Sequence, residues 1–214
     1  MNLRKQIVAQ FREPHGLLGE LAGWVMSNRA SNVQRNRWTV DLLNVQPNDR
    51  ILEIGCGPGI AAEACLQRLK TGKYTGIDHS PVMLQQTARR NAQGAQNGRL
   101  ELHCGNLALL DSMAGGFDKV FSVNVAQFFD DKSQAFKSIK RIMRGGGLLA
   151  TTHQPRNSNP TRRDAVQAAN LFADTLADAG FADVEIKELM LKDVPAMCVL
   201  ATKPINESTE EKTK

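Results

Sequence analysis

Short apolar runs alternate with longer amphipathic segments along most of the chain, and turn-forming residues separate them. The apolar runs have the lengths and compositions of buried strands, which we predict at 51–54, 74–77, 100–104, 117–124, 148–152, 184–189 and 196–202. Most of them are separated by a segment of helical length, so the pattern predicts parallel strands joined by crossover helices. Only a turn around Lys192 and Asp193 separates the last two runs, which predicts an antiparallel hairpin.

The amphipathic segments predict helices at 32–44, 61–69, 82–91, 133–143 and 163–179. Ser80 and Pro81 form a start signal for the third of these, because a hydroxyl can cap the first turn and proline fits the first helical position. Asp130 or Asp131 would cap the fourth helix. The three glycines at 145–147 are expected to break the chain before the strand at 148–152.

This order of elements predicts an α/β fold with a doubly wound, mostly parallel seven-stranded sheet that ends in an antiparallel C-terminal hairpin. We divide the chain into an N-terminal helical extension at 1–47, one α/β domain at 48–204 and a tail at 205–214. The tail has no apolar residue from Asn206 onward, so we expect it to be disordered.

A glycine-rich turn follows the first predicted strand and is the most informative local feature of the chain. Gly55, Gly57 and Gly59 stand at every second position between that strand and a helix. Glycine allows backbone conformations that a side chain would block, and N–H groups at such a junction can meet a ligand closely. Asp78 ends the second strand, where a carboxylate can accept hydrogen bonds from both hydroxyls of a ribose, although it could simply cap the next helix. Together these residues predict a site for an adenosine-containing ligand.

The spacing of the glycines does not match a dinucleotide site. Dinucleotide-binding turns follow the pattern G-x-G-x-x-G, whereas this turn reads G-x-G-x-G and position 60 is Ile. Glu53 lies inside the apolar strand, where a buried carboxylate needs partners, and we assign it to holding the turn and, through water, a cationic amino group of the ligand. The segment from Leu52 to Gly59 resembles, nearly letter for letter, the first motif of the class I S-adenosylmethionine-dependent methyltransferases.

This resemblance extends in the expected order over residues 48–202 and implies further contacts with S-adenosylmethionine. The residues after the third strand resemble the adenine-binding stretch of the family, in which the backbone amide of Leu107 would meet the ring. Asn106 stands where the family usually has aspartate, and its amide oxygen can still accept a hydrogen bond from the adenine amino group. The fourth strand resembles the fourth motif, so Asn124 would bring its carbonyl and side chain to the transferring methyl group.

The N-terminal extension is similar to that of small-molecule methyltransferases of the ubiquinone and menaquinone biosynthesis type. This similarity implies that residues near Met26, Asn28 and Arg37 approach the cofactor and that the extension closes over it. A simpler interpretation is that Trp24, Met26 and Trp38 are core-facing residues that tie the extension down. The two roles are compatible.

Methyl transfer from a sulfonium needs alignment more than acid–base chemistry, because the methyl carbon is already electrophilic. No catalytic dyad is visible in the sequence. We take Asn124 as a group that orients the acceptor, and His153 or His15 as a base for a phenol, carboxylate or thiol acceptor. His79 either contacts the ribose or adenine edge or is a surface residue, and His103 is assigned a structural role.

Composition narrows the class of protein without selecting a function. The net charge is +5, and the basic residues are dispersed over helical segments, so the charge does not favour a nucleic-acid partner. The four cysteines form no C-x-x-C pair, so no metal site is expected. No stretch has the length and apolar character of a membrane span or a secretion signal, which favours a cytoplasmic protein.

The leading hypothesis is an enzyme that transfers a methyl group from S-adenosylmethionine to a small-molecule acceptor by in-line displacement; a homodimer is one arrangement to consider. An RNA or protein methyltransferase of the same fold is the first alternative. Its RNA form is disfavoured because the segment from Asn124 to Gln127 does not follow the Asn/Asp-Pro-Pro-aromatic pattern of enzymes that methylate adenine amines. The second alternative is a protein that binds the cofactor without catalysis.

Overall fold

The computed structural model describes residues 30–156 and 159–205 of the chain. Its strands are β1 (Arg50–Ile54), β2 (Lys73–Asp78), β3 (Leu100–Cys104), β4 (Phe117–Val123), β5 (Met143–His153), β6 (Ala182–Leu189) and β7 (Ala196–Thr202). Its helices are α3 (Ala30–Leu42), α4 (Ile60–Arg68), α5 (Pro81–Arg90), α6 (Ala92–Gln96), α7 (Lys132–Ile142) and α8 (Arg162–Asp178), with short 3-10 helices η1 (Leu107–Asp111) and η2 (Ala126–Phe128). The predictions for His15, Trp24, Met26, Asn28 and the tail lie outside the described residues.

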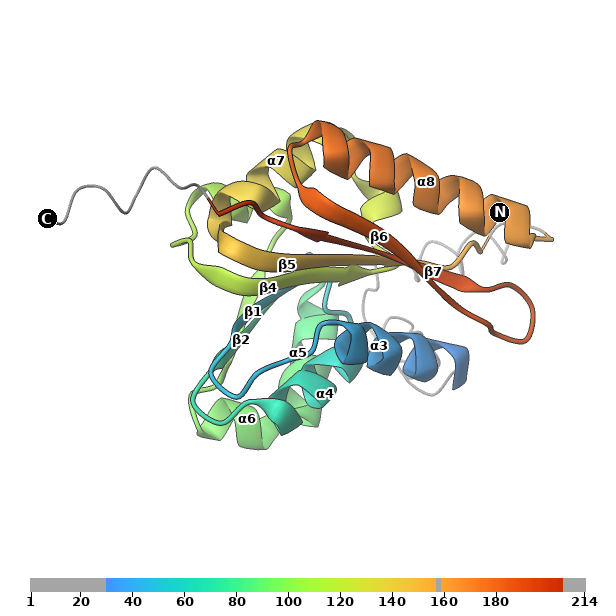
Figure 1. The fold of residues 1–214 in the computed structure, drawn as a ribbon. Coiled ribbons are helices and arrows are strands. Elements are labelled where there is room, and N and C mark those ends of the chain that lie inside the picture. Colours follow the sequence, from blue (N-terminus) through green and yellow to red (C-terminus); the bar gives the residue numbers. More distant parts are fainter. Residues whose placement is uncertain (1–29, 157–158, 206–214) are drawn as a thin grey trace, which may run out of the picture.

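The seven strands form one sheet in the order β3-β2-β1-β4-β5-β7-β6. All neighbouring pairs from β3 to β5 are parallel, and β7 runs antiparallel to both β5 and β6. Helices α7 and α8 cover one face of the sheet, and α3, α4, α5 and α6 cover the other (Figure 1). The predicted doubly wound sheet with a C-terminal antiparallel hairpin is therefore confirmed.

The strand order reverses between β1 and β4, which are adjacent in the sheet although β2 and β3 separate them in sequence. In open α/β sheets, ligands bind at the carboxyl ends of the strands at such a reversal. The turn after β1 and the segments that follow β2, β3 and β4 meet at this edge, so the fold brings the predicted site residues to one place.

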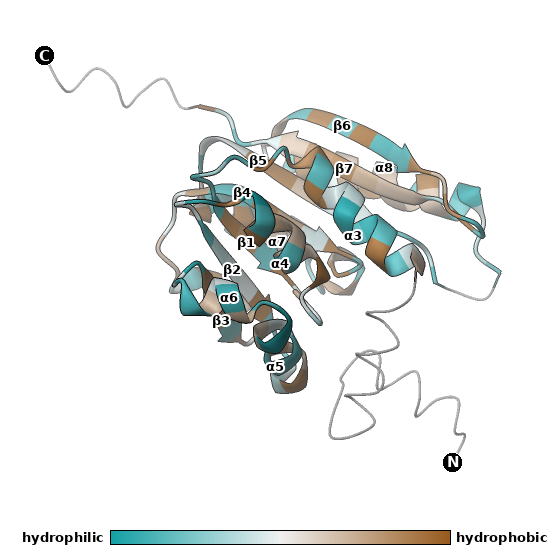
Figure 2. Cartoon of the chain, turned by 90° about the horizontal axis from the view of Figure 1, so that it is seen from below, coloured by the Kyte–Doolittle hydropathy of each residue, from teal (hydrophilic) through white to brown (hydrophobic). Residues whose placement is uncertain are grey.

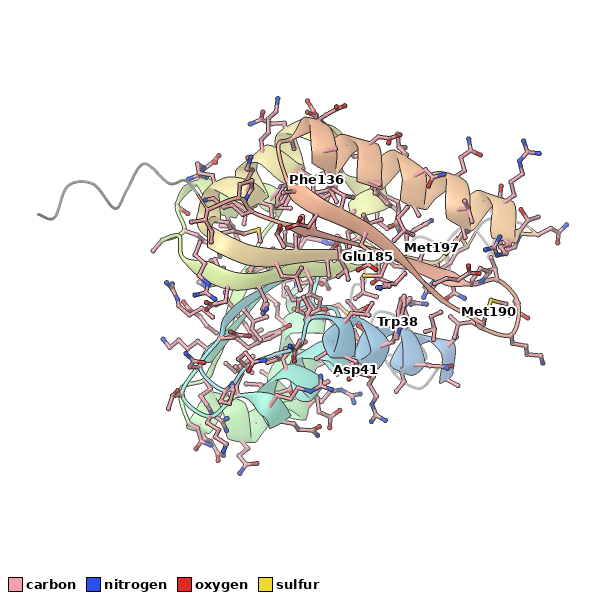
Figure 3. The ribbon with its side chains drawn as sticks, in the orientation of Figure 1. Trp38, Asp41, Phe136, Glu185, Met190 and Met197 are labelled. Carbon is pink, nitrogen blue, oxygen red and sulfur yellow. The ribbon has the colours of Figure 1, made fainter. Side chains whose placement is uncertain are left out.

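Two apolar cores hold the layers together. One lies between the sheet and α7 and α8, and the rings of Phe129, Phe136 and Phe172 meet edge to face within it at centroid distances of 6.1 and 6.4 Å. The other lies under α3 and α4. Trp38 lies on the side of α3 that is turned to the sheet, whereas Asp41 lies on its outer side (Figure 3). This placement agrees with a core-facing role for Trp38.

The helix starts follow the predicted capping chemistry. The Ser80 side chain accepts a hydrogen bond from the backbone N–H of Met83 at the start of α5, and Asp131 accepts one from Gln134 at the start of α7. The sheet edge formed by β6 alternates polar and apolar side chains (Figure 2), as expected for a strand with one face toward solvent. In the described part of the chain, no helix combines the length and apolar character needed to cross a membrane.

The prediction that Gly145–Gly147 break the chain is wrong, because β5 runs through all three glycines. The backbone of Lys203, just beyond β7, exchanges hydrogen bonds with this segment: Gly146 N–H donates to its carbonyl, and its N–H donates to Gly147. Gly146 has a positive φ of 75°, which glycine adopts readily. Pairing with the neighbouring segment thus keeps the glycines in the strand.

Candidate functional site

The glycine turn after β1 adopts the conformation that its sequence predicts. Gly55, Gly57 and Gly59 have φ values of 75°, 52° and 78°, in the left-handed region. A Cβ atom at Gly55 would overlap the Val125 side chain, and one at Gly59 would lie 2.9 Å from Thr87 Cα. A Cβ atom at Gly57 would meet no atom within 4 Å. Packing therefore requires glycine at positions 55 and 59. At Gly57 the space that a side chain would occupy is open, so a ligand can approach the backbone there.

Helix α5 holds the carbonyl groups of this turn. Thr87 Oγ1 donates to the carbonyl of Gly57 at 2.6 Å, and Asn91 Nδ2, at the end of the helix, donates to that of Gly59 at 3.2 Å. Arg90 Nε donates to the carbonyl of Pro58 at 3.0 Å. These bonds fix the turn from one side. The sequence analysis did not identify the three donors, although their spacing of three and four residues places them on one helix face.

Asp78 joins the end of β2 to the glycine turn. Its Oδ2 accepts a hydrogen bond from the N–H of Gly57 at 2.8 Å, and its Oδ1 accepts one from the N–H of Ser80 at 2.9 Å. The side chain is only 7% exposed. Each carboxylate oxygen can accept more than one hydrogen bond, so both remain able to accept from a ribose hydroxyl. His79 is exposed, and its Nδ1 lies 3.8 Å from Asp78 Oδ1.

Glu53 lies beneath the turn and is 1% exposed. The hydroxyl of Tyr74 donates a hydrogen bond to its carboxyl group. Burial raises the pKa of Glu53 well above its usual value; the Tyr74 bond opposes this shift, and the negative charge of Asp78 adds to it. A cationic group bound nearby would favour the ionised form. This environment suits the predicted role of Glu53 toward a ligand amino group.

The end of β3 lies beside the end of β2, because the N–H of Gly105 donates to the carbonyl of Asp78 at 3.0 Å. Asn106 follows and is exposed, and its Oδ1 accepts a hydrogen bond from the N–H of Ala108 at 3.0 Å. This bond caps η1, whose first residue is Leu107. The structure thus brings Asn106 and Leu107 to the same edge as Asp78, while their contacts with adenine remain predictions.

Asn124 follows β4 with a φ of 57°, a conformation that is uncommon outside glycine. Its side chain pairs with the backbone of Gln154: Oδ1 accepts from the N–H at 2.8 Å, and Nδ2 donates to the carbonyl at 3.4 Å. Its own N–H donates to the carbonyl of Thr152 at 2.8 Å. The amide side chain therefore extends the pairing of β4 with β5 by one residue and fixes the turn that leaves β4.

His153 ends β5 and is half-buried. Its Nδ1 lies 3.3 Å from Gln127 Oε1, and its ring meets the ring of Phe172 edge to face at 6.1 Å. Burial, and then the positive charges of Arg35 and Arg156, lower the pKa of His153 to about 4. The imidazole is therefore neutral near pH 7 and a weaker base than an ordinary histidine.

The same histidine lines a cavity of about 280 Å³ together with Pro155, Arg156 and Asp164. The carboxylate of Asp164 accepts hydrogen bonds from the backbone and hydroxyl of Thr161, and these bonds lower its pKa. This cavity lies where β5 ends and α8 begins. His153, one of the residues predicted to act on the acceptor, is part of its lining.

Arg37, which was predicted to approach the cofactor, is exposed on α3. Arg35, two residues earlier, is instead 1% exposed and turns into the molecule. The sequence analysis missed Arg35. In the sequence, Arg35 lies at helical spacing from Asn32, Asn36 and Thr39. Such a polar stripe ordinarily faces water, so the pattern did not indicate a buried arginine.

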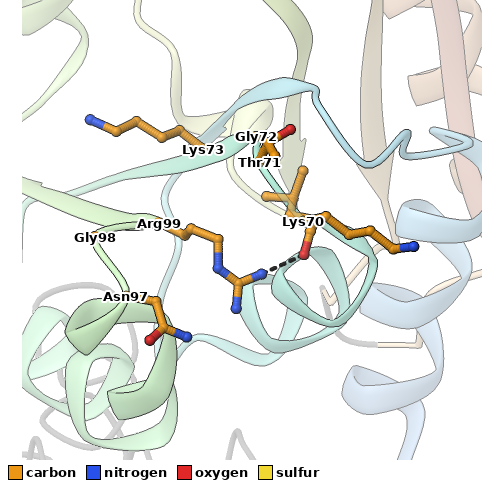
Figure 4. A pocket seen from close by; sticks show the side chains of 8 residues that line it. Lys70, Thr71, Gly72, Lys73, Asn97, Gly98 and Arg99 are labelled. Atoms are coloured by element: carbon orange, nitrogen blue, oxygen red, sulfur yellow. Dashed lines mark hydrogen bonds between the residues drawn. The ribbon is translucent and has the colours of Figure 1, made fainter.

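A larger cavity of about 650 Å³ lies at the opposite edge of the sheet, where β2 and β3 begin. Its cationic side chains do not converge: Lys70 and Lys73 point in different directions, and Arg99 reaches the end of α4 (Figure 4). The guanidinium of Arg99 donates to the carbonyls of Leu66 and Leu69 there. Cations are favourable at the carboxyl end of a helix, so these contacts have a structural explanation.

Comparisons with known proteins agree with this geometry. Residues 51–147 match a family model described as a methyltransferase domain. The chain is 32% identical over 184 residues to an uncharacterized methyltransferase, YdaC, of Bacillus subtilis (strain 168), and the alignment covers 86% of this chain and 98% of the relative.

Two more distant matches have more specific descriptions. Erythromycin 3''-O-methyltransferase of Saccharopolyspora erythraea is 24% identical over 166 residues, and the alignment covers 68% of this chain and 54% of that enzyme. The structure of the N-methyltransferase NodS from Bradyrhizobium japonicum WM9, in complex with S-adenosyl-L-homocysteine, superposes with a TM-score of 0.66 at 18% identity and covers 85% of this chain and 91% of the other. The latter match shows a shared fold.

Proposed function

The chain belongs to the S-adenosylmethionine-dependent methyltransferases, and from that membership we propose that it methylates a small-molecule acceptor at the carboxyl edge of its sheet. The cofactor supplies an electrophilic methyl carbon. The observation that carries the proposal is the bond between Gly57 and Asp78, with open space above Gly57. The open backbone at Gly57 allows close approach of the cofactor, and the buried carboxylate beside it suits the hydroxyls of the sugar.

Three residues are assigned to the cofactor on this basis. Gly57 would allow close approach to the main chain, Asp78 would accept hydrogen bonds from the ribose hydroxyls, and Glu53 would balance the charge of the amino group. Burial raises the pKa of Glu53, and a cation bound nearby would favour its ionised form, which is the basis of the last assignment.

On the acceptor side, Asn124 and His153 would align the reacting group. The neutral imidazole beside Gln127 can accept or donate one hydrogen bond, which suits positioning of an acceptor oxygen or nitrogen. The prediction of a general base stays open, but a conjugate acid with a pKa near 4 is a poor match for removing a proton from a phenol at pH 7. Alignment and exclusion of water would then supply most of the rate enhancement.

The relatives support a small acceptor without naming it. One methylates an oxygen of erythromycin and another is an N-methyltransferase, so both oxygen and nitrogen acceptors occur among proteins similar to this one. The basic residues are dispersed along the sequence, a distribution that does not favour a nucleic-acid partner. We therefore place RNA and protein substrates second. A homodimer and a cytoplasmic location remain predictions.

Transfer of radiolabelled methyl from S-adenosylmethionine to a cell extract tests this proposal, with the products separated into small molecules, RNA and protein. We expect the label in the small-molecule fraction, and we expect an Asp78→Ala variant to label that fraction more weakly at a cofactor concentration that does not saturate the protein. Label in RNA or protein would favour the first alternative. Cofactor binding without any labelled fraction would favour a non-catalytic protein.

A further inference from the structure

Helix α3 turns a polar face toward the sheet. Four of its polar residues are buried and follow one another at helical spacing: Asn32, Arg35, Asn36 and Thr39. The Thr39 and Thr152 hydroxyls lie 2.7 Å apart, which ties the helix to β5. Burying polar groups carries a desolvation cost, so the hydrogen bonds that this buried face makes indicate a specific role.

Arg35 is the central residue of this face. Its guanidinium donates hydrogen bonds to Gln154 Oε1 and to Asn32 Oδ1. The planar guanidinium presents several N–H groups in a fixed geometry, so one side chain can hold two acceptors at once. Arg35 therefore fixes the position of the Gln154 side chain relative to α3.

Gln154 in turn connects three parts of the site. Its Nε2 donates to the carbonyl of Val194, just before β7, at 2.9 Å. Its backbone N–H and carbonyl pair with the side chain of Asn124. The left-handed conformation of Asn124 is unfavourable for most residues and is retained when the surrounding structure specifies it. The chain of contacts from Arg35 through Gln154 thus ends at the turn assigned to acceptor alignment.

The charge of Arg35 also reaches the acceptor side. It is one of two positive charges that oppose protonation of His153, the other being Arg156. The charged group that faces this histidine from α8 is Asp164, across the small cavity. The neighbours on η2 and α8, Gln127 and Phe172, carry no charge. Removing Arg35 should therefore make His153 easier to protonate.

We propose that Arg35 is a positioning residue for methyl transfer, which holds the Asn124 turn through Gln154 and so couples the N-terminal helix to the acceptor side of the site. This inference rests on the proposed function. It assigns no contact between Arg35 and the cofactor, whose predicted partners lie on β1 and β2.

The test compares Arg35→Met and Arg35→Lys with Gln34→Met, a matched control that removes an exposed polar side chain from the same helix. We expect cofactor affinity within about twofold of wild type in all three, measured by calorimetry. Turnover with the labelled acceptor fraction should fall by about tenfold or more in both Arg35 variants, because small misplacements of aligned groups have large effects on rate. Arg35→Lys keeps the positive charge but cannot hold two acceptors in the same geometry. The pKa of His153 should therefore stay low in this variant, while turnover is still reduced.

Two measurements need no acceptor. In NMR spectra, Arg35→Met should raise the pKa of His153 and shift the side-chain amide signals of Asn124, whereas Gln34→Met should move neither. If Arg35→Met does not fold, Arg35→Lys and Gln154→Met test the same connection from its two ends. Turnover within twofold of the Gln34→Met control, or unmoved Asn124 signals, would overturn the proposal. If the wild-type protein transfers no methyl group, the proposed function fails, while the NMR signals still report whether Arg35 holds the turn.

Discussion

The carboxylate of Asp78 accepts hydrogen bonds from two loops at once, and this makes it the most sensitive single residue of the cofactor side. Asp78→Ala would leave the N–H groups of Gly57 and Ser80 without their acceptor and remove the predicted ribose contact. We expect cofactor binding to weaken by about 1 to 3 kcal/mol, the usual effect of unpaired polar groups. Calorimetric titration with S-adenosylmethionine measures this change.

Asp78→Asn is the matched control, because it keeps one acceptor oxygen in the same place. It should lose less affinity than Asp78→Ala. Equal affinity of wild type and Asp78→Ala would contradict the ribose assignment, even if the variant proved less stable.

The lowered pKa of His153 predicts a pH dependence of stability. At pH values above about 6.5 the imidazole is neutral in both the folded and unfolded states. As the pH falls from there toward the folded value of about 4, the unfolded state gains a proton that the folded state does not, so the free energy of unfolding decreases. The full effect would be on the order of 3 kcal/mol.

Glu53 contributes with the opposite sign, because its raised pKa favours the folded state at low pH and this advantage is lost as the pH rises. The informative quantity is therefore the difference between wild type and His153→Gln. Urea unfolding at pH 7 and pH 4.5 should show a smaller loss of stability for His153→Gln. Identical losses in the two proteins would mean that the imidazole protonates freely in the folded state.

Among single residues, the sequence predicted those whose role follows from a short local pattern. Gly57 and Asp78 follow strands directly, so their positions at the ligand edge follow from the order of elements. Arg35 and Gln154 could not be predicted in this way, because the polar stripe on α3 has the spacing of a solvent-facing surface. The stripe is buried because it packs against β5 and the residue after it, where Thr39 meets Thr152 and Arg35 meets Gln154, 119 residues along the chain.

At the scale of elements, Gly57 and Gly59 of the glycine turn share a left-handed backbone conformation, so substitutions at the two positions can be compared. Gly57→Ala places a methyl group in open space, so it should cost only the strain of a left-handed alanine, about 1 to 2 kcal/mol of stability. Gly59→Ala adds contact with the backbone of Thr87 and should destabilise the fold further. Thermal unfolding measures both changes.

The loss of cofactor affinity should follow the opposite order, with the larger loss in Gly57→Ala. A methyl group at Gly57 would fill the space predicted for the ligand, so we expect affinity to fall by more than about tenfold in a protein that remains folded. Unchanged affinity of Gly57→Ala would show that the cofactor does not approach the turn at this residue.

The strands and helices were predicted well because each has a clear period and clear ends. Ser80 and Asp131 supply the expected caps. The prediction at 145–147 was wrong because glycine usually weakens or ends a strand. Here Lys203, just beyond β7, supplies hydrogen-bond partners for the backbone of these glycines. Pairing between segments about sixty residues apart cannot be seen in a local pattern.

At the scale of the whole molecule, a ligand that fits the predicted cofactor site should stabilise the protein against unfolding, and one that does not fit should have no effect. A ligand that binds only the folded state raises the free energy of unfolding by about 2.7 kcal/mol at one hundred times its dissociation constant. S-adenosylmethionine and S-adenosylhomocysteine should therefore raise the melting temperature. A nicotinamide dinucleotide should not, because the turn lacks the third glycine of dinucleotide sites and has Ile60 instead. Stabilisation by the dinucleotide alone would contradict the assignment of the site.

The place of β7 has a consequence for how the protein is made. The last strand of the chain lies between β5 and β6, so a nascent polypeptide that has not yet released residues 196–202 from the ribosome cannot close its sheet. Until then the backbone of β5 from Leu148 to His153 has no partner on that side, and unpaired strand edges invite pairing with other chains. A truncation before Ala196 should therefore aggregate during synthesis, because β5 would keep this edge unpaired.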